Sequence, residues 1–203
     1  MIIGPKFKIA KRLGAPIFEK TQTQKFELSL ARNGKNKRSF RSSQMSDYKI
    51  QLLEKQKMRF TYGVSEKQLR RYVKEAVKKS HNPIDELMSR LETRLDNVVY
   101  RLGLAKTRRL ARQIVSHGHI YINNKKMTVP SHQVKINDVI SVKEGSKKSV
   151  LFSTIKDNYE PNSLPAWLNF DVKNLSGTVV ETPTYNKLES LFDPKQVMEY
   201  YSR

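Results

Sequence analysis

The residues of this chain best suited to chemistry gather in the stretch RLARQIVSHGHIYIN, from Arg109 to Asn123. Arginine guanidinium groups bind phosphates or carboxylates through paired hydrogen bonds, and imidazoles bind metals or polar partners. The two histidines of the stretch flank Gly118, a residue type that adopts a left-handed turn at little cost. The stretch therefore predicts an arginine-bearing helix, a sharp turn and a strand that folds back beside the helix.

The net charge indicates what these arginines bind. Lys and Arg number 39 against 19 Asp and Glu, which gives a formal charge of +20 in 203 residues. Residues 35–79 carry 14 basic and 4 acidic side chains and residues 90–126 carry 9 and 2, whereas residues 150–203 carry 5 and 7. Charge sorted in this way is typical of a protein that lies against a phosphate backbone. No apolar run approaches the ~20 residues of a membrane span, so we expect a nucleic-acid partner and no membrane.

Histidines could instead bind a metal, and the sequence argues against that use. A histidine metal site needs several converging ligands, and carboxylates are sparse around His117 and His119. The chain also has no cysteine, which excludes thiolate sites and disulfides. We therefore expect no metal and no cofactor, and we interpret these histidines as RNA contacts or as packing residues of a hairpin.

Amphipathic helices are predicted to position the basic residues. Apolar residues recur at helical spacing after Ser46, after Ser65, from about Ile84 to Leu102 and after Thr107. Ser46 and Thr107 are predicted N-caps, and Ser65 forms a capping box with Gln68. Acids are sparse on the polar faces of these helices, whereas an ordinary solvated face mixes both signs.

The predicted helix over 84–102 carries Arg90, Arg94 and Arg101, whose spacing of four and seven residues would place them in one stripe. In the next helix, Arg108 and Arg112 are one turn apart and are expected to point together away from its apolar side.

A small sheet is predicted to follow these helices. Its strands are expected at 119–122, 126–129 and 139–142, with tight turns at Asn123-Asn124 and Asn137-Asp138.

The two ends of the chain are predicted to differ. Residues 1–45 show little periodicity, so we expect an irregular basic arm that a partner orders, with a solvated tail as the alternative. Phe40 lies between Arg38 and Arg41, which favours binding because a ring can stack on a base. Near the other end, the alternation of residues 168–172 predicts a strand, Gly177 a turn, and Pro194 the first turn of a final helix.

The stretch ETRLDNVVYRLGLAKTRRLARQIVSHGHIYINNKK closely resembles the RNA-binding domain of the small-subunit ribosomal protein four family. The stretches FRSSQMSDYKIQLLEKQKMRFTYGVSEKQLRRYV, PAWLNFDV and FDPKQVMEYYSR resemble further parts of that family in the same order. The resemblance implies an α+β fold. Its expected parts are a basic N-terminal arm over 1–45, a helical domain over 46–90 plus 193–203, and an inserted RNA-binding domain with a β-rich extension over 91–192.

The resemblance also implies a function. The family is a structural constituent of the small ribosomal subunit and not an enzyme. Its members bind a junction in the five-prime domain of the small-subunit rRNA early in assembly, and they contribute to decoding accuracy. The expected partners are rRNA, mRNA near the tunnel by which it enters the subunit, and small-subunit proteins three and five. The expected location is the ribosome, in the cytoplasm or in an organelle.

We predict rRNA contacts from three parts of the chain. The arm contributes Arg38, Arg41 and Ser43. The first two predicted helices contribute Lys49, Lys55, Lys57, Arg59, Tyr62, Lys67, Gln68, Arg70 and Arg71. The inserted domain and the helix before it contribute Arg90, Arg94, Arg101, Lys106, Thr107, Arg108, Arg109, Arg112, His117, Gly118, His119, Asn123 and Lys125.

The chain departs from the family in its arm, where many members carry a cysteine zinc knuckle and others a basic turn. ARNGKNKRS stands there instead, which leaves the path of the arm on the RNA open.

Two alternative functions also stay open. In an RNA-modifying enzyme that shares the basic domain, Asp96 of the Arg94-Leu95-Asp96 triplet would be catalytic, although we interpret it as the ion-pair partner of a nearby arginine. The other alternative is a free RNA binder that represses an mRNA.

Overall fold

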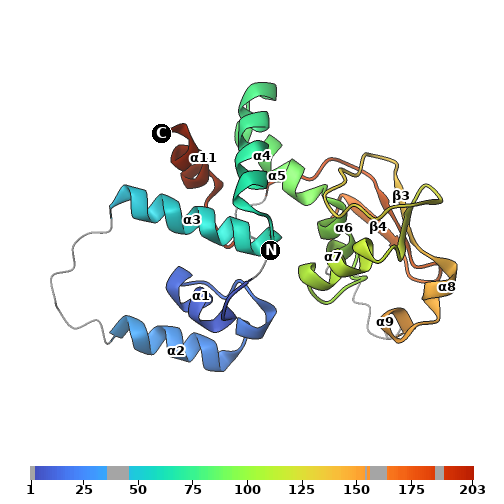
Figure 1. Ribbon diagram of the computed structural model, residues 1–203, viewed down its shortest axis with the longest axis horizontal. Helices are drawn as coiled ribbons and strands as arrows, with labels where there is room; N and C mark the ends of the chain where they lie inside the picture. The colour runs from blue at the N-terminus through green and yellow to red at the C-terminus, as the bar shows by residue number, and fades with distance from the viewer. Residues whose placement is uncertain (1–2, 36–45, 154, 156–163, 186–189) are drawn as a thin grey trace. The chain divides into compact units, whose positions relative to one another are not determined.

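The computed structural model describes residues 3–35, 46–153, 155, 164–185 and 190–203 (Figure 1). The chain divides into two units, one formed by residues 1–84 with 186–203 and the other by residues 85–185. The first unit is helical and the second combines helices with a five-stranded sheet, so the predicted α+β class is confirmed. The unit boundaries differ from the predicted ones, because the N-terminal segment joins the first unit and residues 85–90 join the second.

The prediction of an irregular arm is wrong for the described part of the N-terminal segment. This part forms α1 (Lys6–Leu13), the 3-10 helix η1 (Glu19–Thr21) and α2 (Gln24–Lys35). Ala10, Phe18 and Phe26 form a small apolar cluster, and Phe60 from the next helix packs against it. Helices α1 and α2 are amphipathic, so the helical period is present in this segment, although Gly4, Pro5, Gly14 and Pro16 interrupt it.

Three further helices complete the first unit. They are α3 (Asp47–Tyr62), α4 (Glu66–Lys79) and α11 (Pro194–Ser202). The predicted capping box is present, since the Ser65 hydroxyl accepts from Gln68 N and the Gln68 side chain accepts from Ser65 N, both at 3.3 Å. Helix α11 has Pro194 in its first turn, as predicted, and packs along α3. Val77 of α4 is exposed although it is apolar.

The predicted helix over 84–102 is two helices, α5 (Pro83–Glu92) and α6 (Leu95–Arg101). Arg94 separates them in an extended conformation, with φ −62° and ψ 136°. The backbone at the break bonds to residues distant in sequence: Leu95 N donates to His132 O at 2.9 Å, and Asp96 N donates to Pro130 O at 3.1 Å. Periodicity alone could not show the break, because these bonds depend on tertiary contacts.

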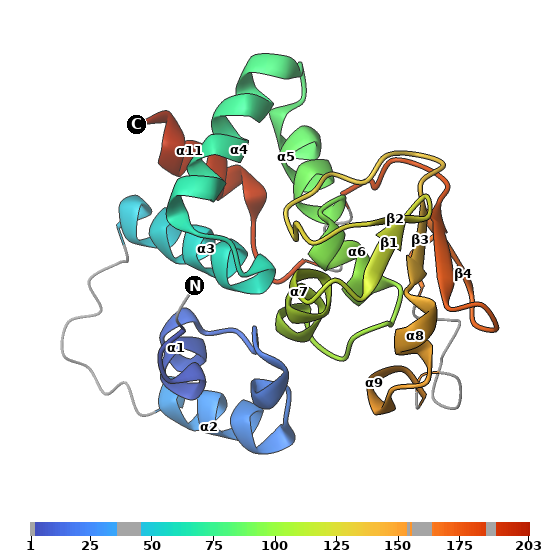
Figure 2. The ribbon, with the colours of Figure 1, turned by 45° about the vertical axis from the view of Figure 1, so that its right-hand side comes forward.

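The second unit packs α6 and α7 (Arg108–Ser116) against one face of an antiparallel sheet (Figure 2). Its strands are β1 (Ile120–Ile122), β2 (Lys125–Lys126), β3 (Val139–Val142), β4 (Leu168–Asp171) and β5 (Ser176–Val179), in the order β2-β1-β3-β5-β4. Asn123 and Asn124 both have positive φ, which confirms the predicted tight turn. Leu102, Ile114 and Ile140 belong to the buried core between the helices and the sheet.

Two short helices, α8 (Glu144–Lys147) and α9 (Val150–Ser153), follow β3, and the sequence did not predict them. Phe152 of α9 is buried in the core of the second unit. No helix in the described parts of the chain is both long enough and apolar enough to span a membrane.

Gly177 lies inside β5 and not in a turn, which corrects the prediction. It pairs with Ile140 of β3 on one side and with Phe170 of β4 on the other. A Cβ at this position would lie 2.5 Å from Cδ2 of the buried Leu102. Glycine is needed because the residue that follows α6 approaches the sheet closely there.

Candidate nucleic-acid interface

Helix α7 and the hairpin of β1 and β2 form the centre of the predicted interface. The Thr107 hydroxyl accepts a hydrogen bond from Leu110 N at 3.0 Å and caps the start of α7, as predicted. Gly118, with φ of 75°, follows α7 and directs the chain into β1. This positive φ is the reason for glycine at the position, because an L side chain rarely adopts it.

The side chains exposed along α7 and on the hairpin after it are mostly basic or polar. Of the predicted contacts, the exposed ones are Lys106, Arg109, His117, Asn123 and Lys125. Sequence reasoning missed Gln113, Ser116 and Lys126, which are also exposed. Gln113 and Ser116 follow Arg109 at helical spacing, so the period of α7 was the signal that could have identified them. Together these residues can offer several hydrogen-bond donors to phosphate oxygens.

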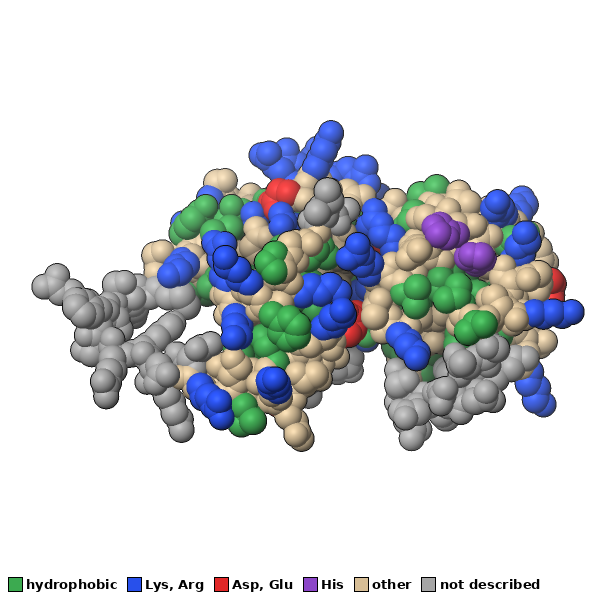
Figure 3. Space-filling model, turned by 60° about the horizontal axis from the view of Figure 1, so that its bottom comes forward, with side chains coloured by type: hydrophobic (Ala, Val, Ile, Leu, Met, Phe, Trp, Pro, Cys, Tyr) green, Lys and Arg blue, Asp and Glu red, His purple; other side chains and the backbone are tan. Residues whose placement is uncertain are grey.

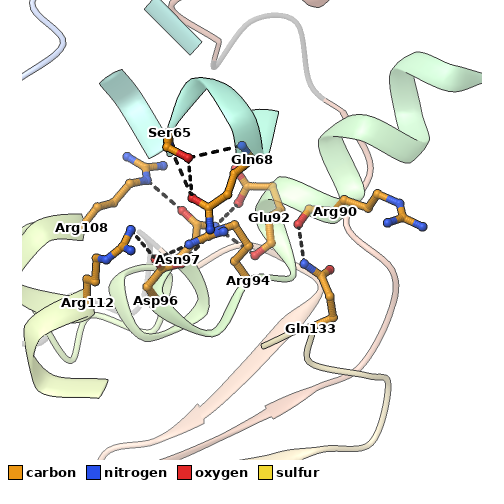
Figure 4. A network of polar contacts seen from close by, with 10 residues as sticks. All are labelled: Ser65, Gln68, Arg90, Glu92, Arg94, Asp96, Asn97, Arg108, Arg112 and Gln133. Atoms are coloured by element: carbon orange, nitrogen blue, oxygen red, sulfur yellow. Dashed lines mark hydrogen bonds and ion pairs between the residues drawn. The ribbon is translucent and has the colours of Figure 1, made fainter. Parts of the chain in front are cut away.

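Arg108 and Arg112 share one side of α7, as predicted, but this side contacts α6. Arg108 Nε donates to Asn97 Oδ1 at 2.8 Å, and Arg112 Nη1 lies 3.9 Å from Asp96 Oδ2 (Figure 4). The guanidinium of Arg108 also lies over the ring of Tyr100, 4.4 Å from its centroid. The Arg112 side chain is 39% exposed. Both arginines are therefore held by α6 while part of each side chain remains at the surface.

Arg94 is a correction to the predicted contacts, because its side chain is fully buried. Its Nε donates to Asp96 Oδ1 at 3.0 Å and its Nη2 to Asp96 Oδ2 at 2.6 Å. A buried guanidinium that is paired in this way cannot reach a phosphate, so Arg94 is not one of the proposed RNA contacts. The expected pairing of Asp96 with a nearby arginine is confirmed, and the Asp96 side chain is 6% exposed.

Arg90 and Arg101 do not form one stripe with Arg94, because the helix is broken between them. Arg90 Nε donates to Glu86 Oε1 at 2.6 Å, within α5. Arg101 donates to both carboxylate oxygens of Glu92, from Nε at 2.9 Å and from Nη2 at 3.0 Å. Each of the two arginines is thus paired with an acid of its own unit.

The histidines that flank Gly118 have different surroundings. His119 is partly buried, with its Nδ1 2.9 Å from the Ser146 hydroxyl and its ring against Phe152. His117 is exposed. Among the described residues, no cluster of three or more histidines and carboxylates could hold a metal ion. His119 therefore packs within the second unit, and His117 is available for contact with a partner.

In the first unit, Lys55 and Tyr62 are corrections to the predicted contacts because both are buried. Lys55 Nζ lies 2.8 Å from Glu66 Oε1 and 4.1 Å from the ring centroid of Tyr200 in α11. The Tyr201 hydroxyl donates to the same Glu66 oxygen at 2.7 Å. Burial opposes the charge of Glu66, but the hydrogen bonds from Lys55 and Tyr201 outweigh it and lower the pKa of Glu66. This cluster joins α3, α4 and α11, with the Lys55 side chain buried and the Glu66 side chain 42% exposed.

Other basic residues of the first unit lie at its surface. Lys49 and Lys67 are exposed, and Arg70 and Arg71 follow Lys67 on the outer face of α4. With Ser65, Gln68 and Lys74, these α4 residues line an open hollow of about 370 Å³. Two other predicted contacts pair with acids, because Lys57 Nζ lies 2.6 Å from Glu54 Oε1 and Arg59 Nη1 lies 3.5 Å from Glu66 Oε2. The outer face of α4 is therefore a basic surface of the described first unit.

Basic side chains are widely spread over the face of the molecule drawn in Figure 3, whereas acidic ones are few. The predicted contacts Arg38, Arg41 and Ser43 lie outside the described residues. Each unit thus carries a basic surface in its described part.

Comparison with known proteins shows the family. Residues 1–92 match the model of the ribosomal protein S4/S9 N-terminal domain, and residues 93–140 match that of the S4 domain. Small ribosomal subunit protein uS4 of Sulfurihydrogenibium sp. is 42% identical over 201 residues, which cover 98% of each chain. The uS4 protein of Aquifex aeolicus is 40% identical over 209 residues, or 99% of this chain and 98% of its own. With two domain models matched in sequence order and relatives aligned along nearly the whole length, this chain belongs to the uS4 family of small ribosomal subunit proteins.

Proposed function

We propose that the chain is a structural constituent of the small ribosomal subunit and binds its rRNA through the basic surfaces of both units. The uS4 family is one of ribosomal proteins and not of enzymes. In this function the side chains position the protein on RNA, and no reaction is required of them.

The observation that carries the proposal is the exposed surface formed by α7 and the hairpin after it. Arg109 is exposed in the first turn of α7, His117 is exposed at its C-terminal end and Lys125 is exposed in the hairpin, and no acid interrupts the sequence between Arg108 and Lys126. Arginine and lysine contacts to phosphates supply most of the affinity in protein–nucleic acid complexes. The proposed contacts are those predicted from the sequence, without the buried Arg94, Lys55, Tyr62 and Gly118 and without His119, which packs within the second unit.

The finer parts of the function rest on the family resemblance. We propose that the chain binds the five-prime domain of the rRNA, nucleates assembly of the subunit body, and contributes to decoding accuracy. Its further partners would be mRNA near the tunnel by which it enters the subunit and small-subunit proteins three and five. The location would be the cytoplasmic ribosome, with an organellar ribosome as the alternative.

Sucrose-gradient sedimentation of a cell extract tests the proposal. We expect the chain to sediment with the small subunit in a one-to-one ratio with its rRNA. A protein that remained mainly at the top of the gradient would instead support a free RNA binder that represses an mRNA. Sequencing of the rRNA that co-purifies with the chain would identify the ribosome as cytoplasmic or organellar.

A further inference from the structure

Asn97 of α6 connects a buried ion pair to an arginine of the proposed RNA surface. The Asn97 side chain is 2% exposed. Its Nδ2 donates to Glu92 O at 3.0 Å and to Glu92 Oε2 at 2.8 Å, while its Oδ1 accepts from Arg108 Nε at 2.8 Å (Figure 4). The same Glu92 carboxylate is held by Arg101. The contacts thus run from Arg101 through Glu92 and Asn97 to Arg108.

The orientation of the Asn97 amide is determined by these partners. An amide rotated by a half turn would place its oxygen against two oxygens of Glu92 and its NH2 group against the guanidinium of Arg108. Such an arrangement would leave buried polar groups without partners, which costs much more than an ordinary exposed hydrogen bond gains. The Asn97 oxygen therefore points to Arg108 and holds its guanidinium, while the Tyr100 ring supports the guanidinium plane.

Asn97 also differs in charge from the partners of the other arginines in this region. Arg94 is paired with the Asp96 carboxylate and Arg101 with the Glu92 carboxylate, so their positive charges are compensated. The amide oxygen of Asn97 is neutral, so this hydrogen bond orients the Arg108 guanidinium while Asn97 itself adds no opposite charge. A charged group that is held in place loses less side-chain entropy when it binds a phosphate.

We propose that Asn97, fixed in turn by Glu92, is a positioning residue that holds the guanidinium of Arg108 ready for an rRNA phosphate. This inference rests on the proposed rRNA-binding function and assigns a role to two buried side chains that do not themselves touch RNA. Asn97 would act through Arg108, so its contribution to affinity should depend on Arg108.

A double-mutant cycle on the full-length chain tests this dependence, with filter binding to a transcript of the small-subunit rRNA that co-purifies with it. We expect Arg108→Ala to weaken binding by about 10- to 100-fold, the scale of a lost charged hydrogen bond. Asn97→Ala should weaken binding severalfold in the wild-type background and not further in the Arg108→Ala background. If the double variant lost affinity by the product of the two single losses, Asn97 would act independently of Arg108 and the proposal would be overturned.

Gln133→Ala is the matched control for loss of a supporting amide. Like Asn97, the Gln133 side chain bonds to one backbone group and one side chain of the second unit. Its Nε2 donates to Arg90 O at 3.1 Å, and its Oε1 accepts from the Thr93 hydroxyl at 2.7 Å. Its two bonds involve no guanidinium group, so the variant should lower the melting temperature without changing the affinity of the folded protein. An equal loss of affinity in Gln133→Ala and Asn97→Ala would show a general structural effect and contradict the proposal.

Arg108→Lys tests the proposal without a change in the core, which matters if Asn97→Ala fails to fold. Lysine keeps the charge but lacks the planar group that Asn97 and Tyr100 hold. We expect Arg108→Lys to lose most of the affinity that Arg108→Ala loses, and wild-type affinity in this variant would overturn the inference. Failure of the wild-type chain to bind the transcript would instead refute the proposed function, so the two failures can be distinguished.

Discussion

At the scale of single residues, burial decides what each arginine of the second unit can do. Arg94 is fully buried and bonded twice to Asp96, whereas Arg112 lies 3.9 Å from the same carboxylate with its side chain 39% exposed. A buried ion pair is worth little compared with apolar packing, but removal of one member leaves an uncompensated charge in the interior. An exposed partner contributes much less, because water screens it.

Arg94→Ala should therefore destabilise the second unit strongly, by about 3–5 kcal/mol, because Asp96 would remain buried with its main partner lost. Arg112→Ala is the control and should cost less than about 1 kcal/mol, as is usual for an exposed pair. Urea unfolding of the full-length chain, followed by circular dichroism, measures both values. Similar losses in the two variants would show that the difference in burial does not determine their roles.

At the scale of elements, two contacts between segments far apart in sequence organise the units. In the second unit, Leu102 after α6 packs directly on Gly177 of β5. In the first unit, Glu66 of α4 binds Lys55 of α3 and Tyr201 of α11. Each contact fixes how neighbouring elements pack, so each can be tested by a small substitution.

Gly177→Ala should destabilise the second unit by about 1–3 kcal/mol, because the added methyl group overpacks a core that has no room for it. Gly145→Ala in α8 is the matched control, since a Cβ there would meet no atom within 4 Å. Thermal unfolding monitored by circular dichroism compares the two. A Gly177→Ala variant as stable as wild type would mean that Leu102 moves aside without cost.

Stability of the first unit should depend on pH through Glu66. The pKa of Glu66 is lower in the folded chain than the ordinary glutamate value of about 4.3, so the charged carboxylate stabilises the fold above that pH. The stabilisation is lost as the pH falls through the folded pKa, where the carboxylate becomes protonated. Glu66→Gln should therefore be less stable than wild type at neutral pH, and the difference should shrink in acid.

Melting temperatures of both proteins across the acidic range measure this effect. Glu75→Gln serves as the control, because Glu75 forms an exposed pair with Arg71 at 3.7 Å within α4. Its difference from wild type should be small at every pH. A Glu66→Gln difference that stayed constant into strong acid would contradict the assignment.

At the scale of the whole molecule, the sorting of charge determines how the chain meets RNA. Basic residues dominate α4 and the segment around α7, whereas residues 150–203 carry more acidic than basic side chains. We therefore expect the affinity for rRNA to fall steeply with salt. The slope of log affinity against log salt should be several units, since each phosphate contact contributes roughly 0.7–0.9.

The salt dependence of single variants should show which residues contribute to this slope. Arg109→Ala should lower it by about one contact, or roughly 0.7–0.9, because Arg109 is exposed on the proposed surface. Lys173→Ala, in the turn between β4 and β5, removes a charge from the acidic part of the chain and should leave the slope unchanged. A nearly flat salt dependence of the wild-type chain would refute phosphate binding as the main source of affinity.

Local features of the sequence were sufficient to predict many of the turns and helix caps of this molecule. The capping box of Ser65, the cap at Thr107, the turn at Gly118 and the paired asparagines after β1 were all predicted, because each depends on residues within a few positions. The distribution of charge likewise predicted a polyanionic partner without reference to the fold. Among the contacts proposed for RNA, Arg109 and Lys125 are exposed, as such a role requires.

Tertiary structure alone decided the features that depend on distant segments. The break at Arg94 arises because the 130–134 segment binds the backbone there, and this break buries an arginine that helical spacing had placed at the surface. Phe60 of α3 packs against the core of the N-terminal helices, and the strand residue at position 177 is glycine because Leu102 packs on it. The sequence alone determines the local hydrogen bonds and the distribution of charge, because both depend on neighbouring residues. The burial of a side chain depends on which residues distant in sequence pack against it and exclude water.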